Sequence, residues 1–370
     1  MSTHFNRNLA GMALLAVCGA ASAQTCESVI SSYSFYVSGN QTSNANQALL
    51  NHPECFGGSS TTSQVQINST TVQQVAAISA ALSSRFMGAL PNQQAVTSTK
   101  SMAAGGQSAQ WNTWGSLSNN DTRQSYTGAN SFETKNDNTI LTAVLGADYV
   151  LSPLMVAGVS VAFDSGTGSG ANAFPGNPSN SLTSKGYTIA PYFGMQINDA
   201  VAVDASVGFG KGEVGMSSAG SSSVLSESGR LFAAANVSYN QWMDKVQLTG
   251  KLGLLHAEED YANSKVAGVA AAGTAAKNTL DQLRMGVQAG YWMDGSMPYA
   301  GLAYASDLNR ATTQFGAGND PIGKNAWVWS LGVNFFSLKS GVTGELVYSQ
   351  EAGRSSQKNN SLLANVNIRF

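Results

Sequence analysis

Charged side chains are scarce in this sequence. They make up 11% of its 370 residues, against roughly 25% in an ordinary soluble domain. Long apolar runs are scarce too: no stretch of about 18 apolar residues follows the first segment, which excludes a helical membrane protein. No basic patch with interleaved aromatic residues occurs, so we expect no nucleic-acid partner. The chain has instead 39 glycines among abundant Ser, Asn and Thr, which is typical of many short strands with polar loops, or of a low-complexity tail.

The first residues have the three-part pattern of a targeting segment. A basic start with Arg7 is followed by an apolar stretch over 9–17 and a small-residue exit at Ala21-Ser22-Ala23. Residues 1–23 are therefore predicted to be a secretory signal peptide.

Cysteine is another scarce residue, with three in the chain. Cys26 and Cys55 remain after signal cleavage, in a short N-terminal segment, 24–62, that enters an oxidising compartment. We therefore expect them to form a disulfide. Their spacing, with His52 nearby, matches no zinc pattern, and neither a metal nor a cofactor is predicted.

From about residue 109 the sequence settles into segments of ten or more residues in which apolar residues recur at every second position. This period predicts strands with one apolar and one polar face. Strands of soluble sandwiches average about five or six residues, whereas crossing a bilayer takes nine to eleven. The predicted strands, twelve in all, cover 111–117, 140–151, 154–164, 187–197, 201–214, 229–242, 245–258, 280–293, 298–308, 326–335, 338–349 and 362–370.

The connections between these segments alternate between very short and long, with long polar loops over 118–138, 165–186, 215–228, 260–279, 309–325 and 350–361. Tight turns at one end and long loops at the other are typical of outer-membrane barrels. Open sheet edges are not tolerated in hydrocarbon, so the sheet must close. The fold predicted for 109–370 is thus an all-β, twelve-stranded antiparallel transmembrane barrel. Eight aromatic residues near strand ends are expected at the membrane interfaces, with scattered core aromatics as the alternative: Tyr149, Tyr187, Trp242, Tyr291, Trp292, Trp327, Trp329 and Tyr348.

Residues 63–88 lack Gly and Pro until Gly88 and predict a helix with a narrow apolar stripe. About 23 helical residues span roughly 34 Å, close to the thickness of a membrane. We expect this helix to lie in the pore, with residues 89–108 as a linker to the first strand.

Six charged residues fall on the polar phase of the strands and are expected to face the lumen: Asp148, Asp204, Arg230, Lys251, Arg284 and Glu345. There the helix offers them hydrogen bonds, and they can pair with one another. Their predicted role is to fill and stabilise a plugged pore. A selective channel is the alternative, and it requires the helix to leave.

A helix just upstream of a twelve-stranded barrel resembles the translocator unit of monomeric autotransporters. The resemblance covers 65–370 and rests on the helix with its 78–86 end, on Leu145-Gly146-Ala147-Asp148-Tyr149, on Pro191-Tyr192-Phe193-Gly194 and on the terminal Phe370. It implies a barrel that anchors and exports an upstream passenger with help from the barrel-assembly machinery. The passenger is short here, since only 24–62 precede the helix.

The last strand ends on an aromatic residue, with Val366, Ile368 and Phe370 on its apolar face. This ending resembles the signal that the barrel-assembly machinery reads, after delivery by periplasmic chaperones.

Catalysis is not expected. His256 is the barrel's only histidine and is predicted to face outward near the external rim, and no Gly-x-Ser-x-Gly elbow occurs. Glu258, Glu259 and Asp260 follow it, and we interpret them as part of a solvated loop rather than a cation site.

The sequence therefore predicts a monomeric outer-membrane barrel of a Gram-negative bacterium, surrounded by lipid and lipopolysaccharide, that exports or displays its N-terminal segment. The alternative is a passive porin or a loop-displaying adhesin in which residues 24–108 stay periplasmic.

Overall fold

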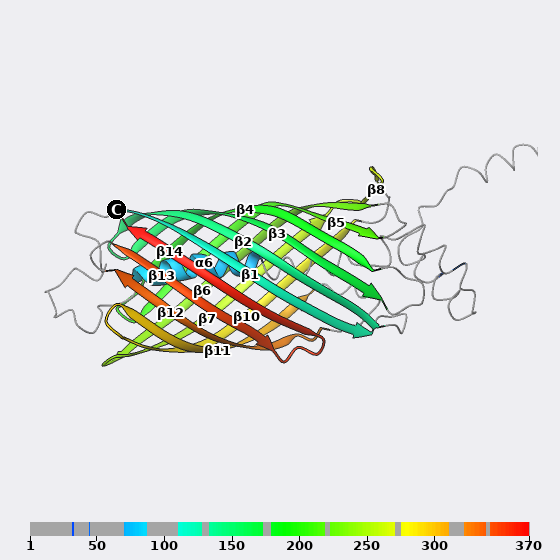
Figure 1. Cartoon of the computed structure of the whole chain (residues 1–370). Helices are drawn as coiled ribbons and strands as arrows, with labels where there is room; N and C mark the ends of the chain where they lie inside the picture. Colours follow the sequence, from blue (N-terminus) through cyan, green and yellow to red (C-terminus); the bar gives the residue numbers. More distant parts are fainter. Residues whose placement is uncertain are drawn as a thin grey trace, which may run out of the picture.

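Twelve long antiparallel strands form a barrel around a helix, α6 (Val72–Phe86), in the computed structural model (Figure 1). The structure describes residues 32, 44, 70–86, 110–127, 133–172, 179–218, 223–270, 275–310, 322–337 and 341–369. The long strands are β1 (Trp111–Thr127), β2 (Glu133–Ser152), β3 (Met155–Asn172), β4 (Asn180–Gln196), β5 (Val201–Ser218), β6 (Val224–Met243), β7 (Val246–Tyr261), β10 (Ala276–Tyr291), β11 (Ser296–Arg310), β12 (Asn325–Ser337), β13 (Val342–Ala352) and β14 (Gln357–Arg369).

The sheet closes on itself, because each long strand is hydrogen-bonded on both sides. The first strand, β1, pairs with its neighbour β2 and also with the last strand, β14, where Asn112 lies opposite Arg369 and Gln124 lies opposite Gln357. Closure satisfies the backbone N–H and C=O groups that a sheet edge would leave open in hydrocarbon. The predicted twelve-stranded antiparallel barrel is confirmed.

Tight turns join the strands at one end of the barrel. Asp244, in the β6–β7 turn, has a φ of 53°, and Asp294 and Gly295, between β10 and β11, have φ of 44° and 100°. This left-handed region is one that Asp tolerates and Gly adopts freely. The β4–β5 turn is held by the side chain of Asn198, which accepts hydrogen bonds from the backbone N–H groups of Ala200 and Val201 at 2.9 and 2.8 Å.

At the opposite end the strands are longer than the sequence predicts. Asp121 pairs with Thr139 and Asn360, and Gly168 pairs with Asn138. The prediction of loops over 118–138 and 165–186 is therefore wrong for most of these residues. The extensions of β1 and β2 are polar on both faces, so they lack the alternation that marks a lipid-facing strand, and backbone pairing holds them instead. A small hairpin, β8 (Lys265–Val266) and β9 (Val269–Ala270), lies within the predicted loop 260–279.

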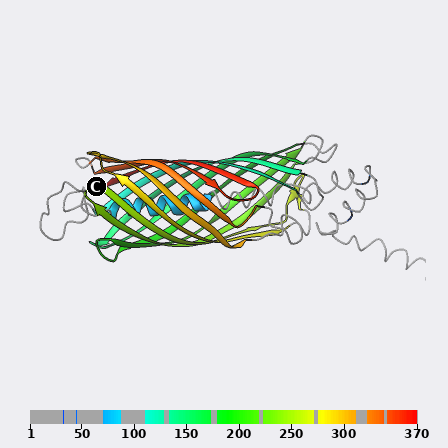
Figure 2. The ribbon, with the colours of Figure 1, turned by 90° about the horizontal axis from the view of Figure 1, so that it is seen from below.

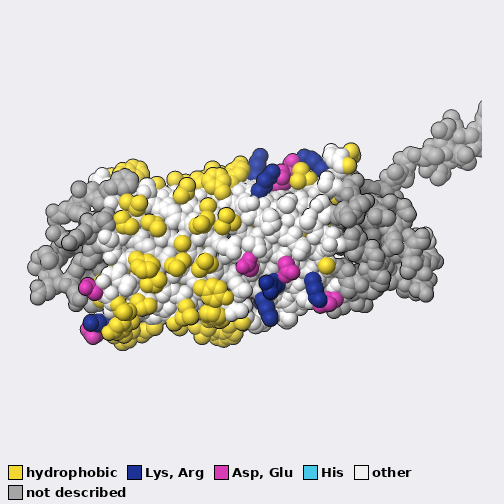
Figure 3. All heavy atoms as spheres, viewed as in Figure 1, with side chains coloured by type: hydrophobic (Ala, Val, Ile, Leu, Met, Phe, Trp, Pro, Cys, Tyr) yellow, Lys and Arg dark blue, Asp and Glu magenta, His cyan; other side chains and the backbone are white. Residues whose placement is uncertain are grey.

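The outer surface of the barrel is divided along its length. Hydrophobic side chains cover the part nearer the tight turns, and most of the visible Lys, Arg, Asp and Glu side chains gather toward the other end (Figure 3). Outward-facing Leu145, Phe163 and Phe209 are 62%, 54% and 54% exposed. A water-soluble monomer rarely exposes such a broad apolar surface, whereas a lipid-facing belt requires it.

The predicted aromatic girdles need one correction. Tyr187, Trp327 and Tyr348 are exposed on the outer surface, but Trp292 is only 5% exposed and packs with Met297, Trp242 and Phe336. The prediction is therefore wrong for Trp292 and Trp242. Trp292 directly follows the half-exposed Tyr291, and successive residues of an extended chain face opposite sides.

Helix α6 has 15 residues, a length of about 22 Å. The remaining parts of the predicted helix, 63–69 and 87–88, lie outside the described residues. In the part of the chain that the structure describes, no helix is both long and apolar enough to cross a membrane.

A charge placed on the apolar belt tests its contact with lipid. We expect Leu145→Arg to lower the free energy of unfolding by about 2–4 kcal/mol, the cost of an arginine near the bilayer midplane. The measurement is reversible urea unfolding in phospholipid vesicles. The control is Thr139→Arg, which lies on the same face of β2 but in the polar extension, and equal losses from both variants would contradict a lipid-facing belt.

Candidate functional site

The interior of the barrel, with its helix, is the part of the molecule whose chemistry is not explained by membrane insertion alone. Two views at right angles both place α6 inside the barrel, in the half nearer the tight turns (Figures 1 and 2). Its described contacts are with β1, β2, β4, β5, β6 and β14. The helix therefore rests on one side of the lumen rather than along its axis.

One face of α6 is completely buried. Gln74, Ala77, Ile78, Ala81 and Leu82 are each at most 1% exposed, and their spacing of three or four residues puts them on a single stripe. Ile78 and Leu82 join a cluster that includes inward-facing Trp114, Val144, Tyr192 and Phe232. Since two of the five helix residues are alanines, the backbone of the helix can approach the wall closely.

Hydrogen bonds also fix the orientation of the helix on the wall. Gln74 donates to Ser160 on β3 at 3.3 Å and accepts from Thr188 on β4. Gln73 donates to Asn120 on β1 and to Ser361 on β14, both at 3.1 Å. These glutamines bind strands on either side of β2, so they fix the rotation of the first turn.

The helix has a defined polarity along the barrel. Its first turn reaches Asn120 and Ser361 through Gln73, whereas Ser79 donates to Asp204 at 2.9 Å, near the start of β5 and beside a tight turn. The chain therefore runs through α6 toward the tight turns. The N-terminal end of the helix points toward the end of the barrel that carries the long strand extensions.

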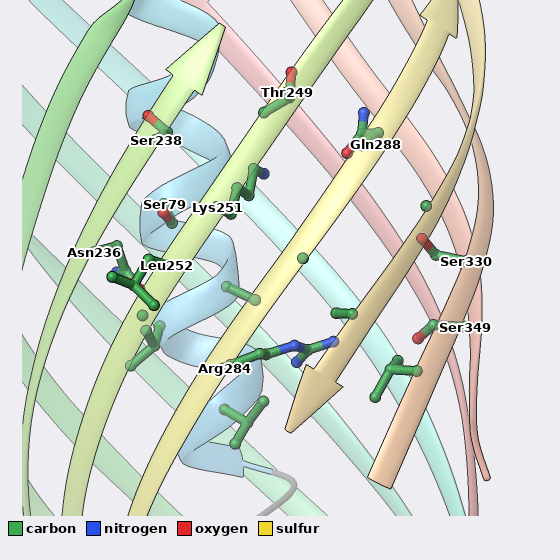
Figure 4. Close-up of a pocket in the computed structure, with 18 of the residues that line it drawn as sticks. Ser79, Asn236, Ser238, Thr249, Lys251, Leu252, Arg284, Gln288, Ser330 and Ser349 are labelled. Atoms are coloured by element: carbon green, nitrogen blue, oxygen red, sulfur yellow. The ribbon is translucent and has the colours of Figure 1, made fainter. Parts of the chain in front are cut away.

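The opposite face of α6 borders open space. A cavity of about 280 Å³ separates Val72, Ala76 and Ser79 from a wall that includes β7, β10, β11 and β12. Figure 4 shows polar side chains, Lys251 and Arg284 among them, lining this space. The helix thus fills only part of the lumen.

Four of the six predicted lumen charges have hydrogen-bond partners inside the barrel. Asp148 is 2% exposed and accepts from Asn112 at 3.1 Å and from Tyr192 at 3.0 Å. Asp204 accepts from Ser79 and from Asn236, the latter at 2.7 Å. Glu345 accepts from Tyr299 at 2.5 Å, and Arg230 is 8% exposed between two carboxylates that are described below.

The remaining two, Lys251 and Arg284, line the cavity without a hydrogen bond or ion pair to any described residue. Among the described contacts, no ion pair joins two of the six charges, and the helix supplies one hydrogen bond, from Ser79 to Asp204.

Two buried ion clusters escaped the sequence analysis. In the first, Arg230 bonds Asp164 at 2.5 Å and Glu259 at 2.9 Å, and Ser228 donates to Glu259 at 2.6 Å. Asp164 is the last residue of its predicted strand. The interpretation of Glu258, Glu259 and Asp260 as part of a solvated loop is wrong, because all three lie on β7 and Glu259 is completely buried. Continuing the inward phase of β7 past Ala257 by one more period would have placed Glu259 inside.

In the second cluster, Arg354 contacts Asp307 at 2.8 Å and also Glu351, and Arg310 contacts Asp307. All four belong to segments that the sequence analysis assigned to loops or to strand ends. There, no alternation of apolar and polar residues indicates which side chains face inward.

His256 is exposed on the outside of β7. It contacts Asp281 at 2.5 Å and Glu258 at 3.6 Å. Glu258 also pairs with Lys277 at 2.9 Å, a hydrogen bond that raises the pKa of this exposed lysine. The acidic cluster is thus matched by cations, and the described residues contain no group of three or more side chains that could hold a metal.

Val366 and Ile368 lie on the outer surface of β14, 48% and 45% exposed. Phe370, Cys26 and Cys55 lie outside the described residues, as do the predicted signal peptide, the segment 24–62 apart from Ser32 and Asn44, and the linker.

A closed barrel with an internal helix and tight turns at one end defines an outer-membrane transport barrel. The family model described as "Autotransporter beta-domain" matches residues 113–349. This is more than half of the chain, which therefore belongs to the autotransporter β-domain family, as its sequence resemblance predicts. Membership implies a location in the outer membrane of a Gram-negative bacterium.

Solved structures show the same fold. The translocator domain of the autotransporter NalP from Neisseria meningitidis is 13% identical, with a TM-score of 0.59 over 84% of this chain and 98% of that one. The transport unit of AIDA-I from Escherichia coli is 11% identical, with a TM-score of 0.57 over 76% and 95%. The β domain of the Bordetella autotransporter BrkA is 15% identical, with a TM-score of 0.53 over 70% and 100%. No curated protein sequence matches the chain.

Removing the cation of the first ion cluster should destabilise the barrel. We expect Arg230→Met to cost about 3–5 kcal/mol of unfolding free energy, because Asp164 and Glu259 would remain buried and unpaired. Arg123→Met is the control, since that side chain is 80% exposed and 3.9 Å from Asp137, and such pairs contribute roughly 0–1 kcal/mol. Urea unfolding in lipid measures both, and a loss below about 1 kcal/mol for Arg230→Met would show that the cluster contributes little.

Displacing the helix should open the pore. Ile78→Asp places a carboxylate in the apolar contact with the wall, where its burial is costly, so we expect α6 to undock and single-channel conductance in planar bilayers to rise several-fold. Ile78→Val is the matched control, because it keeps an apolar side chain in the same contact with the wall and adds no charge to the lumen. Equal conductance of Ile78→Asp and the unmodified protein would contradict the docking described above.

Proposed function

We propose that this protein exports its short N-terminal segment, residues 24–62, through its own barrel and displays it at the cell surface. In this role α6 stays behind as a partial plug once export is complete. The family is one of transport barrels, and we infer that this member has no catalytic activity.

The direction of α6 is the observation that carries the proposal. Its C-terminal half lies beside the tight turns, which face the periplasm in outer-membrane barrels. Its N-terminal end points toward the extended strands, which correspond to the external side. A segment that precedes Val72 is thus directed outward, as a displayed passenger requires.

The fixed rotation of the helix supports the same role. Gln73 and Gln74 bind β1, β3, β4 and β14 together, so the first turn joins strands from widely separated parts of the sequence. We infer that α6 docks as the barrel closes and thereafter anchors the displayed segment.

Further parts of the proposal concern residues outside the helix. We infer that residues 1–23 are removed as a signal peptide, that Cys26 and Cys55 close a disulfide, and that the protein is a monomer in lipid and lipopolysaccharide. The exposed Val366 and Ile368, with Phe370, are proposed to be read by the barrel-assembly machinery after chaperone delivery.

An epitope tag after Gln24 tests display. We expect antibody to label intact cells, because the segment has crossed the membrane. A second tag at the β8–β9 tip, after Gly268, is the control: it lies on the external side whether or not the N-terminal segment is exported.

Labelling of the Gly268 tag on intact cells, with labelling of the Gln24 tag only after permeabilisation, would contradict export. It would favour instead a porin or a loop-displaying barrel with residues 24–108 in the periplasm.

A further inference from the structure

The space beside α6 is charged with one sign. The cavity of about 280 Å³ is bordered by 28 residues, of which Lys251 and Arg284 carry a charge and none is acidic. Lys251 lies on β7 and Arg284 on β10, and both extend into the cavity opposite the helix (Figure 4). Their neighbours are neutral hydrogen-bonding groups, including Thr249, Gln288 and Ser330.

Smaller cavities continue this space in both directions. One of about 50 Å³ lies toward the tight turns and shares Thr249, Lys251 and Gln288 with the main cavity. Another, of about 60 Å³, lies toward the extended strands and shares Arg284 and Ser361. The three cavities therefore follow α6 along its exposed face, and each of the two cations lies where one cavity adjoins the next.

The carboxylates along this route are already engaged. Glu345, in the cavity near the tight turns, accepts from Tyr299, and Glu351, in the cavity near the extended strands, accepts from Arg354. Lys251 and Arg284 interact electrostatically with Asp204 and Glu351, but neither cation has a hydrogen bond or ion pair among the described residues.

Lys251 is exposed to the space inside the barrel and Arg284 is partly exposed, so water or an anion can lie beside each charge, which avoids the cost of desolvating it. Much of the lining is apolar, but Thr249, Gln288 and Ser330 supply polar groups near the cations that can retain water. The cavity therefore has the charge and the chemistry of an anion site.

We propose that the barrel conducts small inorganic anions with α6 still docked, through the passage between the helix and β7, β10 and β11, and that Lys251 and Arg284 select for them. Basic side chains select anions in other pores, and a narrow passage with low-dielectric walls strengthens their field. The passage needs no departure of the helix, and it does not depend on export of the N-terminal segment.

The test is the reversal potential of the full chain in planar bilayers under a KCl gradient. To keep α6 docked, Ser79→Cys and Asp204→Cys are oxidised to a disulfide, with Cys26 and Cys55 replaced by Ser. The lock removes the Asp204 carboxylate, which interacts electrostatically with Lys251, so we expect a small conductance that prefers chloride both in this locked background and in the unmodified protein. Lys251→Gln with Arg284→Gln should abolish the preference, and Lys251→Gln alone should reduce it.

Lys185→Gln is the matched control. It removes the same charge from a lysine that is exposed on the outer surface of β4, outside the passage. It should leave the preference unchanged. If the double variant does not fold, the single Lys251→Gln variant decides, since Lys251 has no hydrogen bond or ion pair among the described residues to lose.

Absence of conductance in the locked protein would overturn the proposal, and so would a preference for cations or one that Lys251→Gln leaves intact. None of these results bears on whether the Gln24 tag reaches the surface, so this inference and the proposed function can fail separately.

Discussion

Pairing of every backbone group in hydrocarbon is the constraint on which the rest of this structure depends. A strand edge left open in lipid is not tolerated, so β14 must return to β1 and the sheet must close. Closure of twelve strands fixes the width of the lumen before any side chain is chosen. That width exceeds what a single helix fills, and the interior has to be completed by side chains, by α6 and by water.

The helix meets this requirement asymmetrically. Its buried stripe, centred on Ile78, packs on the wall formed by β1 to β6, where Trp114, Tyr192 and Phe232 point inward. The facing wall carries small or polar residues instead, such as Gly286, Gly301 and Ser330, and leaves a cavity. A docked helix and a hydrated passage are therefore two results of one arrangement. In the functions that we propose, the docked helix anchors the N-terminal segment and the passage allows ions to cross.

The sequence was sufficient for the part of the fold that lipid contacts. Leu145, Val207 and Val287 alternate with small or polar residues, and this alternation identifies the strands and their outward face. The extensions of β1 and β2 could not be predicted this way, because Asn119 to Thr127 and their partners have water on the outside and polar neighbours on the inside. Backbone hydrogen bonds to neighbouring strands hold these extensions in place, and such pairing produces no periodic pattern in the sequence of a single strand.

The same reasoning explains which parts of the site were predicted. The phase of the strands placed Lys251 and Arg284 toward the lumen, but phase says nothing of how far across the barrel a partner lies. Glu259 lies directly opposite Arg230 in the β6–β7 pair, whereas Asp164 lies on β3 and reaches Arg230 across two intervening strands because the sheet curves. The side of the lumen that α6 occupies likewise depends on the shapes of both walls, which no single segment of the sequence contains.

The position of the helix is the central claim, and disulfide formation in the native membrane tests it most directly. In a background without Cys26 and Cys55, the pair Ser79→Cys and Asp204→Cys joins residues that touch, whereas Ala76→Cys and Ser330→Cys face each other across the cavity. The structure predicts rapid oxidation of the first pair and little of the second. Equal rates, or faster oxidation of the second pair, would contradict a helix docked on the wall of β1 to β6.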